Sequence, residues 1–151
     1  MKLKFVQIHN FRKLQSCRID FSEKETIFVG ANTSGKTTAM DALRIFLERK
    51  SFKTQDFTLS NWKELNKIGE NWTSGKELSE NEKSIKILES YLPSIDLWIE
   101  VADSELHYVS HIIPTLDWKG GLLGVRLRYE PKDVESLIQE FIKAHKTSNQ
   151  L

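Results

Sequence analysis

The sequence predicts an α/β fold in which strands and helices alternate around one core. Three observations predict it. Residues 1–29 hold three strand patterns, a glycine-rich segment at 30–37 stands directly before an amphipathic helix, and two later strand patterns alternate with helical ones. With 151 residues and 39% hydrophobic content, the chain is long enough for one ordinary core and short for two. We therefore expect a single globular unit.

The first part of the chain reads as strand, strand, strand and helix. Residues 3–8 form a short apolar stretch, and residues 17–21 alternate between apolar and polar, as a half-buried strand does. Residues 26–29 are a continuous apolar run, typical of a strand covered on both faces. From 35 to about 49 the apolar residues recur at helical spacing, so a helix follows the glycine-rich segment.

The middle of the chain changes character. Residues 50–78 are polar and show no sustained period, so we expect a long loop or insertion there, ordered in part. Ser79-Glu80-Asn81-Glu82 is a capping-box sequence, and the apolar residues behind it predict a helix that ends at Pro93.

The last third returns to alternating elements. Residues 95–101 and 123–129 alternate between apolar and polar side chains and predict two strands. Between them, 104–113 favours a short helix, and Gly120-Gly121 marks a turn. Asp133 is the expected N-cap of a final amphipathic helix.

One motif carries chemistry. The segment Gly30-Ala31-Asn32-Thr33-Ser34-Gly35-Lys36-Thr37 fits the P-loop pattern G-x-x-x-x-G-K-[ST] and has the strand and helix flanks that the pattern requires. Its glycines let backbone N–H groups turn inward at a helix N-terminus, where the helix dipole also attracts anions. We therefore predict that this chain binds ATP with Mg²⁺.

The roles within the P-loop follow from the side chains. Lys36 is expected to reach the β and γ phosphates, and the Thr37 hydroxyl is expected to ligate Mg²⁺. The predicted nucleotide-binding residues are Gly30, Asn32, Thr33, Ser34, Gly35, Lys36, Thr37 and Thr38.

Residues 1–47 resemble the N-terminal lobe of ABC-type ATPases of the RecF, SMC and OLD (overcoming lysogenisation defect) group. The resemblance lies in Asn10-Phe11-Arg12, followed about 20 residues later by the P-loop and then by Ala42-Leu43. It implies a P-loop NTPase fold with a mixed sheet and flanking helices. It also makes Arg12 a candidate phosphate contact, with an exposed arginine at a strand end as the alternative.

Within that group, residues 92–101 and 127–131 look most like OLD-family ATP-dependent endonucleases. This resemblance implies an ATPase lobe that controls a C-terminal or partner nuclease acting on DNA, in defence against phage. A second ATPase head, in a homodimer or higher oligomer, is a further implied partner. A RecF- or SMC-like DNA-repair head, and a regulatory subunit that binds ATP without hydrolysing it, are the alternatives.

The chain also departs from the group. It has no run of four apolar residues ending in Asp-Glu and no Leu-Ser-Gly-Gly-type signature. No catalytic residue is therefore expected within this chain, which should bind nucleotide but hydrolyse it poorly. We expect 1–151 to be the N-terminal part of an ABC-type ATPase domain: strands, P-loop and helix in 1–49, a loop or insertion in 50–78 and an α/β continuation in 79–151.

Composition limits the remaining possibilities. The chain holds 22 Lys and Arg against 21 Asp and Glu, so no chain-wide charge points to a polyanion. One cysteine excludes an internal disulfide, and no apolar run is long enough for a bilayer, so we expect a cytoplasmic protein without membrane contact.

Weaker signals are left with structural interpretations. We expect Gly69 to Lys76, a near-match to a P-loop, to be a flexible loop, and His107 and His111 to be solvated rather than zinc ligands. Arg126 and Arg128 form either a local basic strip or an ordinary solvated strand face.

Overall fold

The computed structural model describes residues 1–22, 26–29, 33–74 and 78–148. The strands are β1 (Lys2–Phe11), β2 (Leu14–Phe21), β3 (Thr26–Val29), β4 (Ser94–Val101) and β5 (Gly121–Arg128). The α-helices are α1 (Thr33–Leu47), α2 (Trp62–Thr73), α3 (Leu78–Tyr91), α4 (Leu106–Val109) and α5 (Val134–Ser148). Short 3₁₀ turns lie at Thr54–Asp56, Leu59–Asn61 and Asp103–Glu105.

The described strands form one sheet with the order β3-β2-β1-β4-β5. The α/β class is confirmed, and one detail differs from expectation, because all four strand pairings are antiparallel where a mixed sheet was predicted. Short connections join β1 to β2 and β2 to β3, and such connections permit only antiparallel neighbours. The strand that follows α1 along the chain, β4, joins the sheet beside β1 and runs opposite to it.

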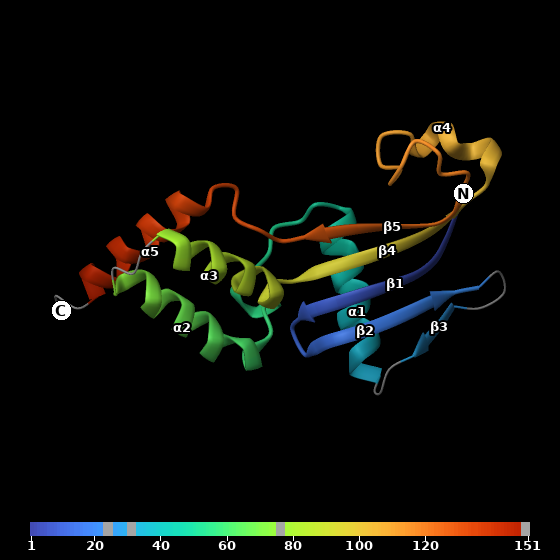
Figure 1. Ribbon diagram of the computed structural model, residues 1–151. Helices are drawn as coiled ribbons and strands as arrows, with labels where there is room; N and C mark the ends of the chain where they lie inside the picture. The colour runs from blue at the N-terminus through green and yellow to red at the C-terminus, as the bar shows by residue number, and fades with distance from the viewer. Residues whose placement is uncertain (23–25, 30–32, 75–77, 149–151) are drawn as a thin grey trace.

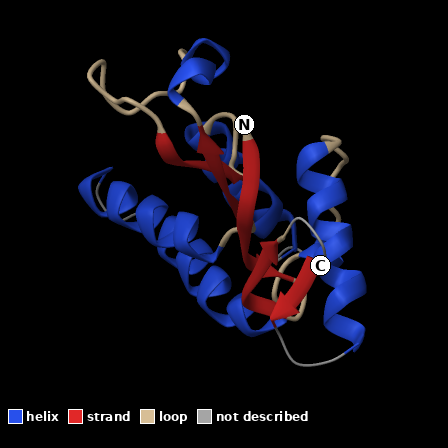
Figure 2. Ribbon diagram, turned by 90° about the vertical axis from the view of Figure 1, so that its right-hand side faces the viewer, coloured by secondary structure: helices blue, strands red, loops and turns tan. Residues whose placement is uncertain are grey.

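The main core lies between this sheet and α1. Val6, Ile8, Ile19 and Ile95 are fully buried on the sheet, and they pack with the two buried alanines of α1, Ala39 and Ala42. Small side chains on the helix allow its backbone to approach the strands closely. Figure 1 shows α1 crossing behind the strands, and Figure 2 shows it to one side of them.

A second core belongs to a group of three helices, α2, α3 and α5, here called the helical lobe. Its buried residues are Ile68, Trp72, Leu88 and Leu92, with Leu137 and Ile138 of α5 packed against them. The helical lobe lies beyond one end of the sheet (Figure 1). A third, smaller cluster of Val101, Val109 and Leu123 holds α4 against the other end of β4 and β5.

The region 50–78, expected to be a partly ordered loop or insertion, contains α2, a helix that was not predicted. Ile68 and Trp72, four residues apart, are buried on one face of the helix, but polar neighbours and Gly69 hide this period in the sequence. The expected flexible loop at Gly69 to Lys76 falls partly on α2 and partly on residues 75–77, which lie outside the described part.

The remaining elements agree with the predicted ones to within a few residues at each end, as the helix at 104–113 illustrates: it is confirmed but shortened to α4. Among the described residues, no helix combines the length and apolar composition that crossing a bilayer requires.

Candidate functional site

The predicted P-loop lies at a strand-to-helix junction. β3 pairs with β2 in the register Arg18↔Val29 to Phe21↔Thr26, and α1 begins four residues after β3 ends. The strand and helix flanks predicted for the motif are therefore present. Gly30 and Asn32, two of the predicted binding residues, lie outside the described residues.

The other predicted residues form the start of α1. Thr33 and Ser34 are its first residues, and Gly35, Lys36, Thr37 and Thr38 complete its first turns. Lys36 and Thr37 are exposed, and a Cβ added to Gly35 would meet nothing within 4 Å. No atom of the described residues would therefore meet a group that approaches Gly35 from this side.

The charges of α1 suit an anion at its N-terminus. Its first turn contains no acidic side chain, and its last turn contains the basic residue Arg44. Lys36 is exposed on the first turn of the helix. A helix start with free N–H groups, a lysine and a hydroxyl is the donor set that phosphate and a hard cation require.

These groups fit Mg·ATP. Lys36 would balance phosphate charge, the Thr37 hydroxyl would offer an oxygen ligand to Mg²⁺, and the N–H groups at the start of α1 would donate to phosphate oxygens. Bound Mg²⁺ would supply charge neutralisation between neighbouring phosphates. No general base or acid for hydrolysis was predicted in this chain.

Arg12 lies just beyond the end of β1, and two carboxylates hold its guanidinium. Its Nε donates to Asp56 Oδ1 at 2.9 Å, and its Nη1 donates to Asp41 Oδ2 at 2.7 Å. Partial burial opposes the charged form, but the hydrogen bonds to Asp41 and Asp56 outweigh it, so the pKa of Arg12 lies above its ordinary value. Sequence reasoning missed both partners, which lie 29 and 44 residues away.

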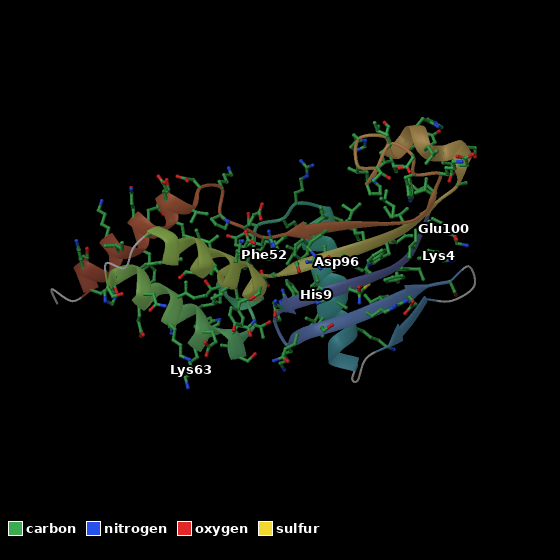
Figure 3. All side chains as sticks on the ribbon, viewed as in Figure 1. Lys4, His9, Phe52, Lys63, Asp96 and Glu100 are labelled. Atoms are coloured by element: carbon green, nitrogen blue, oxygen red, sulfur yellow. The ribbon has the colours of Figure 1, made fainter. Side chains whose placement is uncertain are left out.

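The face of the sheet opposite α1 carries charged pairs. Asp96 accepts two hydrogen bonds from Arg126, at 2.6 and 2.7 Å, and His9 Nε2 lies 3.4 Å from the same carboxylate. Figure 3 shows His9 and Asp96 beside each other. A cleft of about 380 Å³ opens between this end of the sheet and α3, lined by these basic residues together with Lys86 and Glu89.

The two arginines of β5 are not a free basic strip, because each already has acidic partners. Arg128 lies 3.0 Å from Glu130 and 3.4 Å from Glu89, and Arg126 pairs with Asp96. His107 and His111 are exposed, and the described residues contain no group of three or more His, Cys, Asp or Glu side chains placed to hold a metal.

Comparison with known families identifies the fold that carries this site. The sequence pattern of the AAA ATPase domain matches residues 1–151. The chain belongs to the AAA ATPase domain family. This membership confirms the predicted P-loop NTPase-like fold class.

Curated relatives of this AAA ATPase domain carry the name "DNA replication and repair protein RecF". The protein from Exiguobacterium sp. is 33% identical over 63 residues, which are 41% of this chain and 17% of the relative. The protein from Thermoanaerobacter sp. is 29% identical over 117 residues, 77% of this chain and 31% of the relative. The protein from Clostridium botulinum is 32% identical over 89 residues, which are 58% of this chain and 24% of the relative. The matched part thus spans less than a third of each relative.

Proposed function

We propose that this chain is the ATP-binding lobe of a RecF-like ATPase and binds Mg·ATP through residues 30–38. The observation that carries the proposal is the P-loop sequence at the β3 to α1 junction, where the helix start holds Lys36 and Thr37 exposed and has no acidic side chain. Membership of the AAA ATPase domain family supports the same ligand.

Calorimetry with Mg·ATP tests this proposal. Wild-type protein should bind, and Lys36→Ala should weaken binding by about 10- to 100-fold, because a charge-assisted hydrogen bond to phosphate contributes about 1.5–3 kcal/mol. Lys63→Ala is a matched control, since Lys63 is an exposed lysine on α2, far along the chain from the P-loop. Equal affinities for all three proteins would refute the proposal.

The magnesium role of Thr37 has its own test. Thr37→Val removes the hydroxyl and keeps the shape, so it should weaken binding of Mg·ATP while changing binding of ATP in EDTA little. An equal loss with and without Mg²⁺ would assign Thr37 to the phosphates or to the helix fold rather than to the metal.

The wider process follows from the relatives. We propose that the chain forms the N-terminal part of a longer ATPase whose partner is DNA, since the relatives are named for DNA replication and repair. The resemblance to ABC-type ATPases adds a second ATPase head to this proposal. Residues 1–49 would supply the P-loop, and hydrolysis would need groups that this chain does not hold. Single-turnover hydrolysis by the full-length protein, compared with Lys36→Ala, separates this ATPase from a subunit that only senses ATP.

A second candidate is an OLD-like ATPase that controls a nuclease in phage defence. The residues that favour it, 92–101 and 127–131, form β4, the end of β5 and the residues after it, and Ile95 pairs directly with Leu127. A Toprim-type Glu and Asp-x-Asp set in the full-length protein, with metal-dependent DNA cleavage, would support this candidate. A long coiled coil, or no cleavage with Mg²⁺ and ATP, would favour the RecF-like process.

A further inference from the structure

The tripeptide Asn10-Phe11-Arg12 has an unusual backbone. Asn10 and Arg12 adopt φ angles of 54° and 51°, in the left-handed region that non-glycine residues rarely occupy, while Phe11 between them is fully buried. Such conformations cost free energy and persist only where surrounding contacts hold them. The contacts of these residues therefore indicate what the conformation is for.

Asp56 is a buried carboxylate that accepts a hydrogen bond from Arg12. Its side chain is 1% exposed, and its two carboxylate oxygens accept from Arg12 Nε at 2.9 Å and from the Lys53 backbone N–H at 2.8 Å. The backbone N–H of Arg12 also donates to the Asp56 carbonyl at 2.9 Å. Two independent bonds thus fix Arg12 to the segment that follows α1.

Asp41 is the second carboxylate that forms an ion pair with Arg12. It lies on α1, four residues and about one helical turn after Thr37. Arg12 Nη1 donates to Asp41 Oδ2 at 2.7 Å, and the Asp41 side chain is about one third exposed. Arg12 therefore connects a buried carboxylate to α1, about one turn after the predicted magnesium ligand.

We propose that Arg12 is a positioning residue that sets the affinity for Mg·ATP by holding α1 through Asp41, with Asp56 as its anchor. The inference rests on the proposed ATP-binding function. It differs from the phosphate contact that the sequence resemblance implies, because in this role Arg12 acts through the helix and touches no phosphate.

The two roles predict opposite effects of one substitution. If Arg12 acts through Asp41, then Asp41→Asn removes the ion pair and weakens Mg·ATP binding as Arg12→Gln does. If Arg12 binds phosphate, Asp41→Asn releases the guanidinium from a competing carboxylate, so affinity stays the same or rises. Asp41→Asn is also nearly isosteric and lies at a partly exposed position, so it leaves the packing of α1 unchanged.

The experiment measures dissociation constants for Mg·ATP, and for ATP in EDTA, on the full-length protein. The variants are Arg12→Gln, Asp41→Asn, the double variant, and Arg12→Lys, with Lys36→Ala as the reference for a lost phosphate contact. We expect each single variant to weaken Mg·ATP binding by about 3- to 10-fold and the double variant to be no weaker than either, since both remove one interaction.

A readout beyond affinity separates positioning from a general loss of fold. Because Asp41 holds the turn that carries Thr37, the loss should be larger for Mg·ATP than for ATP in EDTA, whereas partial unfolding lowers both alike. Arg12→Lys, which keeps the charge but lacks the planar fork of guanidinium donors, should fall between wild type and Arg12→Gln.

Each outcome decides the inference. Wild-type or tighter binding by Asp41→Asn, or additive losses in the double variant, would overturn it while leaving the proposed function intact. If Arg12 variants do not fold, Asp41→Asn alone still decides. If wild type itself binds no Mg·ATP and equals Lys36→Ala, the proposed function fails first and this inference falls with it.

Discussion

Gly69 offers the sharpest test of how the helical lobe is packed. It is a buried glycine inside α2, and a Cβ placed on it would lie 2.8 Å from Phe141 Cε1 and 3.0 Å from Cε2, with Cζ closer still. The Phe141 ring of α5 also packs edge-on against Trp72, with ring centroids 5.7 Å apart. A methyl group at position 69 must therefore push this ring away from α2.

The expected size of the effect combines opposing contributions. Alanine is a better helix former than glycine by about 1 kcal/mol. Overpacking costs roughly 1–3 kcal/mol, and disturbing the contact of Phe141 with Trp72 costs about another 1 kcal/mol. Since Phe141 is 37% exposed and its ring can partly move into solvent, the lower part of that range applies. We expect Gly69→Ala to lower the free energy of unfolding by about 1–2 kcal/mol.

Urea unfolding followed by far-UV circular dichroism measures this change, and a second background makes it decisive. In Phe141→Ala the ring is absent, so Gly69→Ala should become stabilising by about 0.5–1 kcal/mol through helix propensity alone. Asn66→Ala, at an exposed position of the same helix, is the control that should stabilise in both backgrounds. Stabilisation by Gly69→Ala in the wild-type background, or an equal loss in both, would refute the packing argument.

Two further predictions concern the sheet. Hydrogen bonds from Arg126 hold the pKa of Asp96 below its ordinary value. The stability that this ion pair contributes is therefore present above about pH 4, the pKa of an unfolded aspartate, and is lost as the pH falls through the pKa of Asp96 in the folded protein. Asp96→Asn should thus cost about 1 kcal/mol at pH 7, because Arg126 is 60% exposed, and nothing near pH 2; a pH-independent difference in urea midpoint would contradict this. Gly120 has φ 101°, and a Cβ there would lie 2.8 Å from the Val101 carbonyl oxygen. Gly120→Ala should therefore lower the free energy of unfolding by about 1–3 kcal/mol, as measured by thermal unfolding. Gly124→Ala is the control and should cost less, because Gly124 has an ordinary φ.

Much of the fold was predictable because local patterns specify it. The period-two stretches became β2, β4 and β5, and the apolar stretches at 3–8 and 26–29 became β1 and β3. The glycine-rich segment followed by helical spacing marked the start of α1. What the sequence alone could not supply was the order of strands, in which β4 lies beside β1 although the paired residues Gln7 and Asp96 are 89 positions apart in the chain. That pairing depends on the whole core rather than on any local signal.

Helix α2 was also not predicted because a residue far along the chain determines part of its sequence. Gly69 weakens the helical pattern of α2, yet glycine is required there because Phe141, 72 positions further along the chain, lies against it. The site shows the same limit. Lys36 and Thr37 were predicted from the motif. The carboxylates that hold Arg12 belong to no motif, and their contact is visible only once α1 and the 53–56 segment are placed in space.

The separation of the cores affects which parts of the molecule unfold locally and exchange their amide hydrogens with solvent. The sheet and α1 share one buried cluster, the helical lobe has another, and the α4 end has a third. Separate clusters open as separate cooperative units, and the unit with the fewest buried contacts opens at the lowest free energy. Amide hydrogens of α4 should therefore exchange with solvent first and those of β1, which lies between two strands and over α1, last. β1 should therefore be the slowest-exchanging strand of the sheet. Arg12, which directly follows β1, holds α1, the helix of the predicted P-loop, through its hydrogen bond to Asp41.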